Sequence, residues 1–173
     1  MYSSSRSGPP NAQLVMVGDG PGHRDIQESL TASGDIARVR LTGRMPQVDV
    51  AAVLACADVL AAPHAYAEGT IVGTPLKILE YMAAGRAIVA STAPIHELVQ
   101  HGISGHRVAP GDGHALADGI LALLEDDVLR GRYGREASRL AKTYSWASVA
   151  QRLRTLFEEV RQTSGVRPSV ARA

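Results

Sequence analysis

The chain has 173 residues, with 18 lysines and arginines against 17 aspartates and glutamates and 45% hydrophobic residues. This near-neutral composition is typical of one soluble globular domain and excludes a collagen, a coiled coil or a wholly disordered chain. Apolar runs such as residues 51–57 are far shorter than the ~20 residues that cross a bilayer, so we expect no transmembrane segment. The amino terminus has no hydrophobic signal segment, which favours a cytoplasmic protein.

Two further features of the composition exclude classes of partner. Basic residues are scattered and aromatic residues make up 4% of the chain, so nucleic-acid binding is not expected. The histidines lack metal-ligand spacing, so we expect no metal site. The single Cys56 lies between alanines and is expected to be a buried small hydrophobic residue in a reducing compartment.

The first part of the chain alternates short apolar runs with amphipathic stretches. Residues 1–12 are polar and rich in Ser, Pro and Gly, which predicts a disordered leader. The expected strands are residues 14–17, 39–42, 59–62, 87–90 and 106–108. The expected helices are near residues 24–33, 48–57, 75–84 and 95–100. Strand alternating with helix predicts an α/β fold, a Rossmann-like parallel sheet with helices on both faces.

Two longer helices are expected after the last strand. Their apolar residues recur at helical spacing: Leu116, Ile120, Leu123 and Leu124 in the first, and Trp146, Val149, Leu153, Leu156, Phe157 and Val160 in the second. Both stripes are expected to be core, and Ser145 is expected to cap the second helix. Residues 163–173 lack periodicity and are expected to be a flexible tail, which leaves residues 13–162 as the folded domain.

In open α/β sheets, ligands bind beyond the carboxyl ends of the strands, so the loops there are the first candidates for a site. Gly18 and Gly20 follow the first strand, where they permit close approach of a ligand, although a tight turn without a ligand explains them as well. Arg44 follows the second strand and could face a phosphate or a base, or be an ordinary solvated arginine.

The stretch from residue 63 to residue 85 is the most informative. Thr74 is a plausible N-cap, Pro75 suits the first helical position, and Gly85 suits the left-handed residue after the helix. The amino terminus of such a helix attracts a phosphate. Lys77 and Glu80 share a helix face, where Lys77 could meet that anion or simply pair with Glu80 at the surface.

The motifs together resemble a family. They are LVMVGDGP, VRLTGRMPQVDVAAVLACADVLAAPH, GTPLKILEYMAAGRAIVAS, ELVQHGISGHRVAPGD and YSWASVAQRL. In this order, over residues 13–159, they resemble the carboxyl-terminal domain of retaining GT-B glycosyltransferases of the group 1 family, which includes mannosyl- and glucosyltransferases of cell-envelope synthesis. The resemblance implies the carboxyl-terminal half of a GT-B enzyme that lacks its first strand and helix, where the family carries an arginine and a lysine that clamp the diphosphate.

The resemblance also implies a site for a nucleotide-diphosphate sugar, with no dissociable metal and no other cofactor. Glu80 matches the family's second glutamate, which holds the ribose hydroxyls, and Gly18 and Gly20 match the turn that lines the donor cleft. Arg44 and Met45 lie in the loop whose backbone reads the base. The matches that face the phosphates are the turn Gly73, Thr74, Pro75 and Leu76 and the following Lys77. The family's first glutamate is replaced by Val72, and Glu68 lies four positions earlier.

Three functions remain open at this stage. The favoured one is the donor-binding half of a glycosyltransferase, inactive until an amino-terminal acceptor-binding domain or subunit completes it. The second is a noncatalytic nucleotide-sugar-binding module, and the third is a GT-B sugar-nucleotide epimerase. No catalytic residue, sugar, base, acceptor or oligomeric state follows from the sequence.

Overall fold

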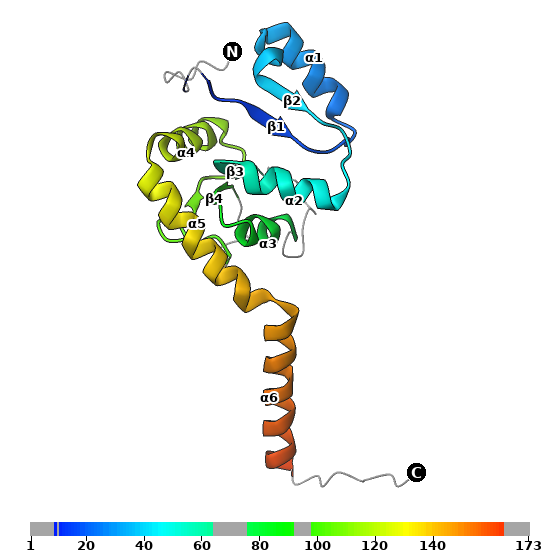
Figure 1. Cartoon of the computed structure of the whole chain (residues 1–173), viewed down its shortest axis with the longest axis vertical. Coiled ribbons are helices and arrows are strands. Elements are labelled where there is room, and N and C mark those ends of the chain that lie inside the picture. Colours follow the sequence, from blue (N-terminus) through cyan, green and yellow to red (C-terminus); the bar gives the residue numbers. More distant parts are fainter. Residues whose placement is uncertain (1–8, 10, 64–75, 92–97, 165–173) are drawn as a thin grey trace.

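The structure is a computed structural model that describes residues 9, 11–63, 76–91 and 98–164 (Figure 1). Its strands are β1 (Leu14–Met16), β2 (Val39–Leu41), β3 (Val59–Ala62), β4 (Ala87–Ala90) and β5 (His106–Arg107). Its α-helices are α1 (His23–Ser33), α2 (Gln47–Cys56), α3 (Leu76–Ala83), α4 (Gly113–Glu125), α5 (Asp127–Ala141) and α6 (Trp146–Ser164). Two 3₁₀ turns, η1 (Asp35–Arg38) and η2 (Lys142–Tyr144), precede β2 and α6.

All strand pairs of the described chain are parallel, which confirms the α/β class. Within the described ranges the strands form two sheets, one of order β1-β2 and one of order β3-β4-β5. Leu14 pairs with Val39 in the first sheet, and Val59 pairs with Ala87 in the second. The expected single sheet is therefore divided between β2 and β3, which α2 connects.

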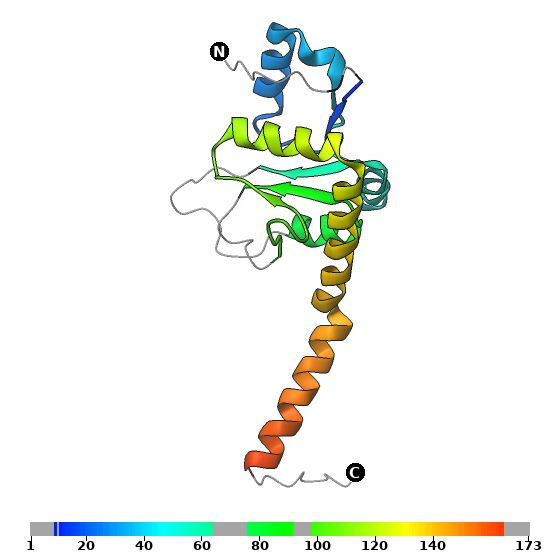
Figure 2. The ribbon, with the colours of Figure 1, turned by 90° about the vertical axis from the view of Figure 1, so that its left-hand side faces the viewer.

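Strand β4 lies at the centre of the hydrophobic core, and all four of its residues are buried. Ile88 and Ala90 point to one side, where they pack with α3 and with Ala137 of α5. Ala87 and Val89 point to the other side, where they meet Leu123 and Tyr133 from α4 and α5. Helices thus cover both faces of this sheet, as expected for a parallel sheet (Figure 2).

Strand β1 is apolar in sequence but exposed in the structure. Leu14, Val15 and Met16 are 48%, 44% and 36% exposed. An uninterrupted apolar run is typical of a parallel strand that is covered on both faces. Among the described residues, β1 pairs along one edge with β2, so its other edge and much of its apolar surface are open.

Helix α5 was not expected from the sequence. It begins at a cap in which the Asp126 carboxylate accepts a hydrogen bond from the Leu129 amide at 2.8 Å. Its buried residues are Tyr133, Gly134 and Ala137, a narrow stripe of mostly small side chains. At Gly134 a Cβ atom would overlap the carbonyl oxygen of Gly85, so the two backbones are in direct contact. Gly85 has φ +67°, which confirms the expected left-handed residue after α3.

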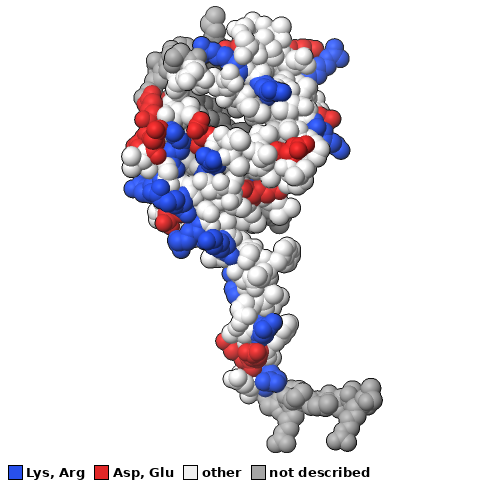
Figure 3. All heavy atoms as spheres, in the orientation of Figure 1, with Lys and Arg blue, Asp and Glu red and all other residues white. Residues whose placement is uncertain are grey.

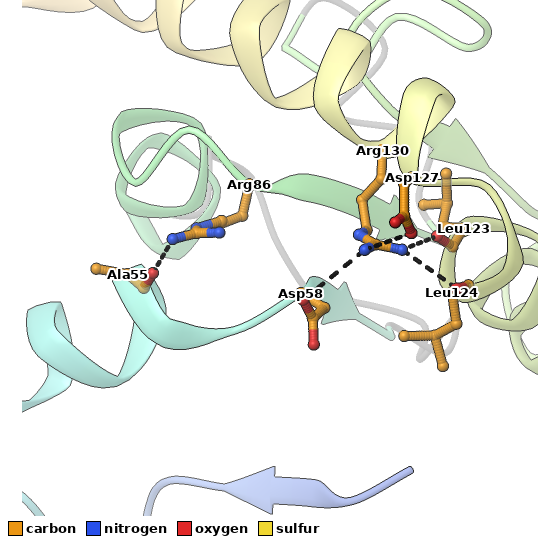
Figure 4. Close-up of polar contacts among 7 residues, drawn as sticks. All are labelled: Ala55, Asp58, Arg86, Leu123, Leu124, Asp127 and Arg130. Atoms are coloured by element: carbon orange, nitrogen blue, oxygen red, sulfur yellow. Dashed lines mark hydrogen bonds and ion pairs between the residues drawn. The ribbon is translucent and has the colours of Figure 1, made fainter. Parts of the chain in front are cut away.

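Arg130 fastens the start of α5 to its neighbours (Figure 4). Its guanidinium donates to the carbonyl oxygens of Leu123 and Leu124 at 2.9 Å and 3.2 Å. Both carbonyls lie in the last turn of α4, where carbonyl groups have no partner within the helix. It also forms an ion pair with Asp127 at 2.7 Å and lies 4.0 Å from Asp58, the residue before β3. These contacts fix the packing of α4, α5 and β3.

Helix α6 extends away from the two sheets (Figures 1 and 2). The Ser145 hydroxyl accepts from the Ser148 amide at 3.2 Å, which confirms the predicted cap. The helix continues through Ser164, so residues 163 and 164, which were expected in the tail, are helical. The prediction that its apolar stripe is core is wrong, because Trp146 is 88% exposed and Phe157 is 68% exposed.

Three other expectations from the sequence need correction or fall outside the structure. Cys56 is exposed at the end of α2 and not buried. Residues 98–100 form a turn, and the rest of the helix expected at 95–100 lies outside the described residues. Of residues 1–12 the structure describes residues 9, 11 and 12, so the predicted leader lies almost entirely outside the described residues.

The surface charge is less even than the sequence suggests. Exposed basic residues recur along one side of α5 and η2, and Figure 3 shows this gathering of Lys and Arg. They are Arg132, Arg135, Arg139 and Lys142. None of the described helices combines the length and apolarity that a membrane span requires.

Candidate functional site

Two of the loops singled out in the sequence lie side by side at the ends of β1 and β2. The amide of Gly18 donates to the carbonyl oxygen of Gly43 at 2.9 Å, and the two residues form an isolated antiparallel bridge. Gly18 has φ +135°, a conformation that favours glycine. The backbone therefore joins the turn of Gly18 and Gly20 to the loop that contains Arg44 and Met45.

Gly20 belongs to the tight turn that starts α1. Its carbonyl oxygen accepts from the amide of His23 at 2.9 Å. A Cβ at Gly20 would meet no atom within 4 Å, so the space beside this glycine is open. The structure thus shows the turn that the sequence predicts and leaves room beside it for another molecule.

The loop after β2 leads directly into α2. Arg44 is exposed and Met45 is half-buried. The carbonyl oxygen of Pro46 accepts from the amides of Asp49 and Val50, at 3.0 Å and 3.1 Å, so the helix begins immediately after this loop. As a result, the first residue of α2, Gln47, lies two residues beyond Met45.

Gln47 connects this loop to α3. Its side-chain amide donates to Oε1 of Glu80 at 2.8 Å. Glu80 is the residue that the sequence singles out on the exposed face of α3, and it remains exposed in the structure. An ionised carboxylate offers about four acceptor positions, so the bond from Gln47 orients Glu80 and leaves most of its accepting capacity free. Sequence reasoning missed Gln47, because its partner lies far along the chain.

Lys77 does not pair with Glu80 in the part of the chain that the structure describes, so the i,i+3 surface pair weighed in the sequence is not formed there. Lys77 is half-buried, and this burial lowers the pKa of its ammonium group. Burial and the neighbouring Glu80 carboxylate both raise the pKa of the Tyr81 hydroxyl. The exposed face of α3 therefore carries a partly desolvated cation one turn before an oriented carboxylate.

The buried face of α3 is formed mainly by two residues. Ile78 and Met82 are fully buried. Leu76 is 75% exposed, and Tyr81 packs against the core cluster. The beginning of α3 is thus open at Leu76, next to Lys77.

Part of the candidate site falls outside the description. Gly73, Thr74 and Pro75, which carry the predicted phosphate-binding turn, lie outside the described residues, as do Glu68 and Val72. In the described ranges, no three His, Cys, Asp or Glu residues form a group that could hold a metal ion. The part of the site that the structure describes is therefore Gly18, Gly20, Arg44, Met45, Gln47, Leu76, Lys77 and Glu80.

Comparison with known proteins gives consistent results. Residues 3–126 match the model of the family described as glycosyl transferases group 1. The phosphatidyl-myo-inositol mannosyltransferase of Mycobacterium leprae is 35% identical over 162 residues, which cover 93% of this chain and 41% of that protein. The chain thus spans about two fifths of the length of the curated relatives that it matches.

Solved structures extend this likeness to the fold. The Anabaena protein HepE, solved in complex with UDP, aligns with a TM-score of 0.71 and 25% identity over 88% of this chain and 42% of HepE. Sucrose-phosphate synthase from Thermosynechococcus elongatus aligns with a TM-score of 0.73 and 23% identity, over 87% of this chain and 39% of that enzyme. The second likeness shows the fold alone.

Proposed function

The chain belongs to the group 1 glycosyl transferases, and we propose that it forms the donor-binding part of such an enzyme. The donor would be a sugar carried on a nucleoside diphosphate, transferred to an acceptor with retention of anomeric configuration. HepE, which is 25% identical to this chain, was solved with UDP, and this supports a nucleotide donor. The mannosyltransferase relatives support a role in cell-envelope synthesis, and we propose that the chain acts in the cytoplasm.

The observation that carries the proposal is the hydrogen bond from Gln47 to Glu80. A ribose presents two neighbouring hydroxyl donors, which a fixed carboxylate can accept together. Gln47 holds one carboxylate oxygen of Glu80 and also begins the helix that follows the loop of Arg44 and Met45. A nucleoside with its ribose on Glu80 would therefore have its base near this loop.

The base would lie against the backbone of residues 43–45. The Gly43 carbonyl oxygen accepts a hydrogen bond from the Gly18 amide, and this bond holds the loop against the glycine turn. Gly18 and Gly20 would then line the cleft for the donor, where the absence of side chains permits close approach. Arg44 is exposed and free to lie over a base or beside a phosphate.

The diphosphate would bind at the start of α3. The amides of the turn Gly73, Thr74, Pro75 and Leu76 are the proposed donors, with proline supplying none. Lys77 lies in the first described turn of α3, and its ammonium is partly desolvated. A phosphate oxygen would offset this desolvation, because an opposite charge favours the charged lysine.

Transfer requires donor and acceptor to be held together in reactive geometry. The chain corresponds to about two fifths of its relatives, so we assign it binding of the donor and not turnover by itself. Catalysis would need an acceptor-binding domain, in the same polypeptide or in a separate subunit. No residue of this chain is assigned a catalytic role.

Isothermal titration calorimetry with UDP, GDP and ADP tests the proposal. One of the three should bind, and Glu80→Gln should weaken its binding by about tenfold or more, because an amide is a weaker acceptor and donates where the ribose also donates. Glu158→Gln, on the projecting helix α6, is the matched control and should bind like the wild type. Failure of all three nucleotides to bind, or equal binding by Glu80→Gln, contradicts the proposal.

A further inference from the structure

Helix α2 is fastened to the neighbouring α3–β4 segment at both of its ends. At its start, the Gln47 side chain donates to Glu80 of α3 at 2.8 Å. At its end, the Arg86 guanidinium donates to the backbone carbonyl oxygen of Ala55 (Figure 4). Arg86 follows α3 and comes directly before β4. The two contacts are eight positions apart in the helix, or about 12 Å, so together they set the direction of α2.

The contact at the end of α2 satisfies a group that the helix itself cannot satisfy. Ala55 is the second-last residue of α2, and the last carbonyl groups of a helix have no donor within it. These carbonyl groups also carry the partial negative charge of the helix dipole, which a cation stabilises. The permanently charged guanidinium of Arg86 therefore fits this end of α2 both as a donor and as a charge.

Arg86 reaches α2 from a rigid part of the molecule. Its backbone lies against α5, because a Cβ atom at Gly134 would stand 3.4 Å from the Cα atom of Arg86 and would overlap the carbonyl oxygen of Gly85. Gly134 is buried, and so are all four residues of β4, which begins directly after Arg86. The chain beside Arg86 thus belongs to the packed core, and a guanidinium based there can fix the end of another helix.

We propose that Arg86 is a positioning residue for the nucleotide and acts through α2. Fixing the end of α2 sets the direction of the helix, and with it the place of Gln47 and of residues 43–45, which lead into its start. Those residues are proposed to contact the base, and Glu80 the ribose, so the direction of α2 sets the distance between the two contacts. A small misplacement of such groups costs affinity for the ligand that they hold together. The role of Arg86 therefore rests on the proposed function.

Calorimetry on Arg86→Met tests this role with three ligands: the nucleoside diphosphate that binds the wild type, its nucleoside, and inorganic pyrophosphate. Methionine keeps an aliphatic stem and removes the donor. The nucleoside diphosphate and the nucleoside should each weaken by about three- to tenfold, since both place a base and a ribose. Pyrophosphate, which would need only the start of α3, should bind unchanged. Arg135→Met, at an exposed arginine of α5, is the matched control and should bind all three ligands like the wild type.

A double-variant cycle shows whether the effect passes through α2. Gln47→Ala removes the contact at the start of the helix, and Arg86→Met removes the one at its end. Once Gln47 no longer holds Glu80, a displaced helix cannot break that bond, so the combined loss of affinity should be smaller than the product of the two single losses. A combined loss as large as the product, or larger, overturns positioning through α2.

Native-state hydrogen exchange without nucleotide gives a second readout that does not depend on binding. Amides at the carboxyl end of α2 should exchange faster in Arg86→Met than in the wild type, and unchanged exchange overturns the contact on which the role depends. A wild type that binds none of UDP, GDP and ADP contradicts the proposed function and removes this role with it. A wild type that binds one of them, together with equal binding by Arg86→Met or an equal loss for pyrophosphate, overturns the role of Arg86 alone.

Discussion

Gln47 and Glu80 are separated by 33 positions in the chain, yet their side chains are joined by a hydrogen bond of 2.8 Å. This contact connects the start of α2 to the exposed face of α3. It makes Gln47 a positioning residue for the carboxylate that is proposed to bind ribose.

Gln47→Ala should therefore weaken the nucleotide less than Glu80→Gln does. The carboxylate would remain but would lose the donor that orients it, and at this exposed site we expect a cost of about 1 kcal/mol, or roughly fivefold in affinity. Calorimetry with the preferred nucleotide measures the change, and Gln151→Ala on α6 is the control. Rescue by Gln47→Asn is not expected, because the shorter side chain cannot reach Glu80. An unchanged affinity in Gln47→Ala would show that the carboxylate needs no orientation.

Lys77→Met separates phosphate binding from ribose binding. The variant should weaken the nucleoside diphosphate much more than the nucleoside, because only the diphosphate brings charge to Lys77. Calorimetry on both ligands gives the comparison. Equal losses for the two would contradict contact with phosphate.

The unliganded Lys77→Met variant should also be at least as stable as the wild type at neutral pH. The lowered pKa of Lys77 means that folding disfavours its charged form. The cost is full below the folded-state pKa and decreases as the pH rises from there to 10.5, because the unfolded chain binds more protons in that window. Denaturant unfolding at neutral and at alkaline pH should show the advantage of the variant shrinking as the pH rises.

Two glycines of α5 should respond in opposite ways to alanine. Gly134→Ala should lower the free energy of unfolding by about 2–3 kcal/mol, since its Cβ would overlap the Gly85 carbonyl and neither backbone can yield easily. Gly131→Ala should raise it by about 1 kcal/mol through helix propensity. Its Cβ would meet only the end of the flexible Arg135 side chain, at 3.3 Å. Urea unfolding of both variants measures the difference, and destabilisation of equal size would rule out the specific α3–α5 contact.

His106 should make the fold sensitive to mild acid. Burial, and secondarily the ring of His101 at 4.9 Å, lower its pKa below 6.5. Between that lowered pKa and 6.5 the unfolded state binds more protons, so stability falls as the pH falls through this window. Unfolding at pH 7.5 and pH 5.5, compared between His106→Gln and the control His23→Gln, should show a smaller pH dependence only in the former. No difference between the two variants would assign the acid sensitivity elsewhere.

Most of the fold could be predicted because most of its strands and helices leave a local pattern in the sequence. The strands at residues 59–62 and 87–90 appear with the predicted bounds, since short apolar runs next to turns are strong signals. Helix α5 was missed because it packs through Gly134 and Ala137, and small residues leave no apolar periodicity. The stripe of α6 was read correctly as amphipathic, but periodicity does not say what covers an apolar face.

The candidate site was predictable in part for the same reason. Glycine loops and the helix with Lys77 and Glu80 are local features of the sequence, and their positions at strand ends follow from the α/β class. The Gly18–Gly43 hydrogen bond agrees with that placement. Gln47 was missed because a contact between α2 and α3 depends on how the helices pack, which no local pattern encodes.

The division of the strands into two sheets has a consequence for how the molecule opens. The β1–β2 sheet has three paired positions and an exposed apolar strand, whereas β4 is buried throughout. Native-state hydrogen exchange should therefore resolve two cooperative units, with the amides of β1 and β2 exchanging through a low-energy partial unfolding and those of β4 only through global unfolding. A nucleotide bound to both the Gly43 loop and Glu80 would slow exchange in the β1–β2 unit first. Partial unfolding of that unit would break the nucleotide site, so it would cost the free energy of binding in addition.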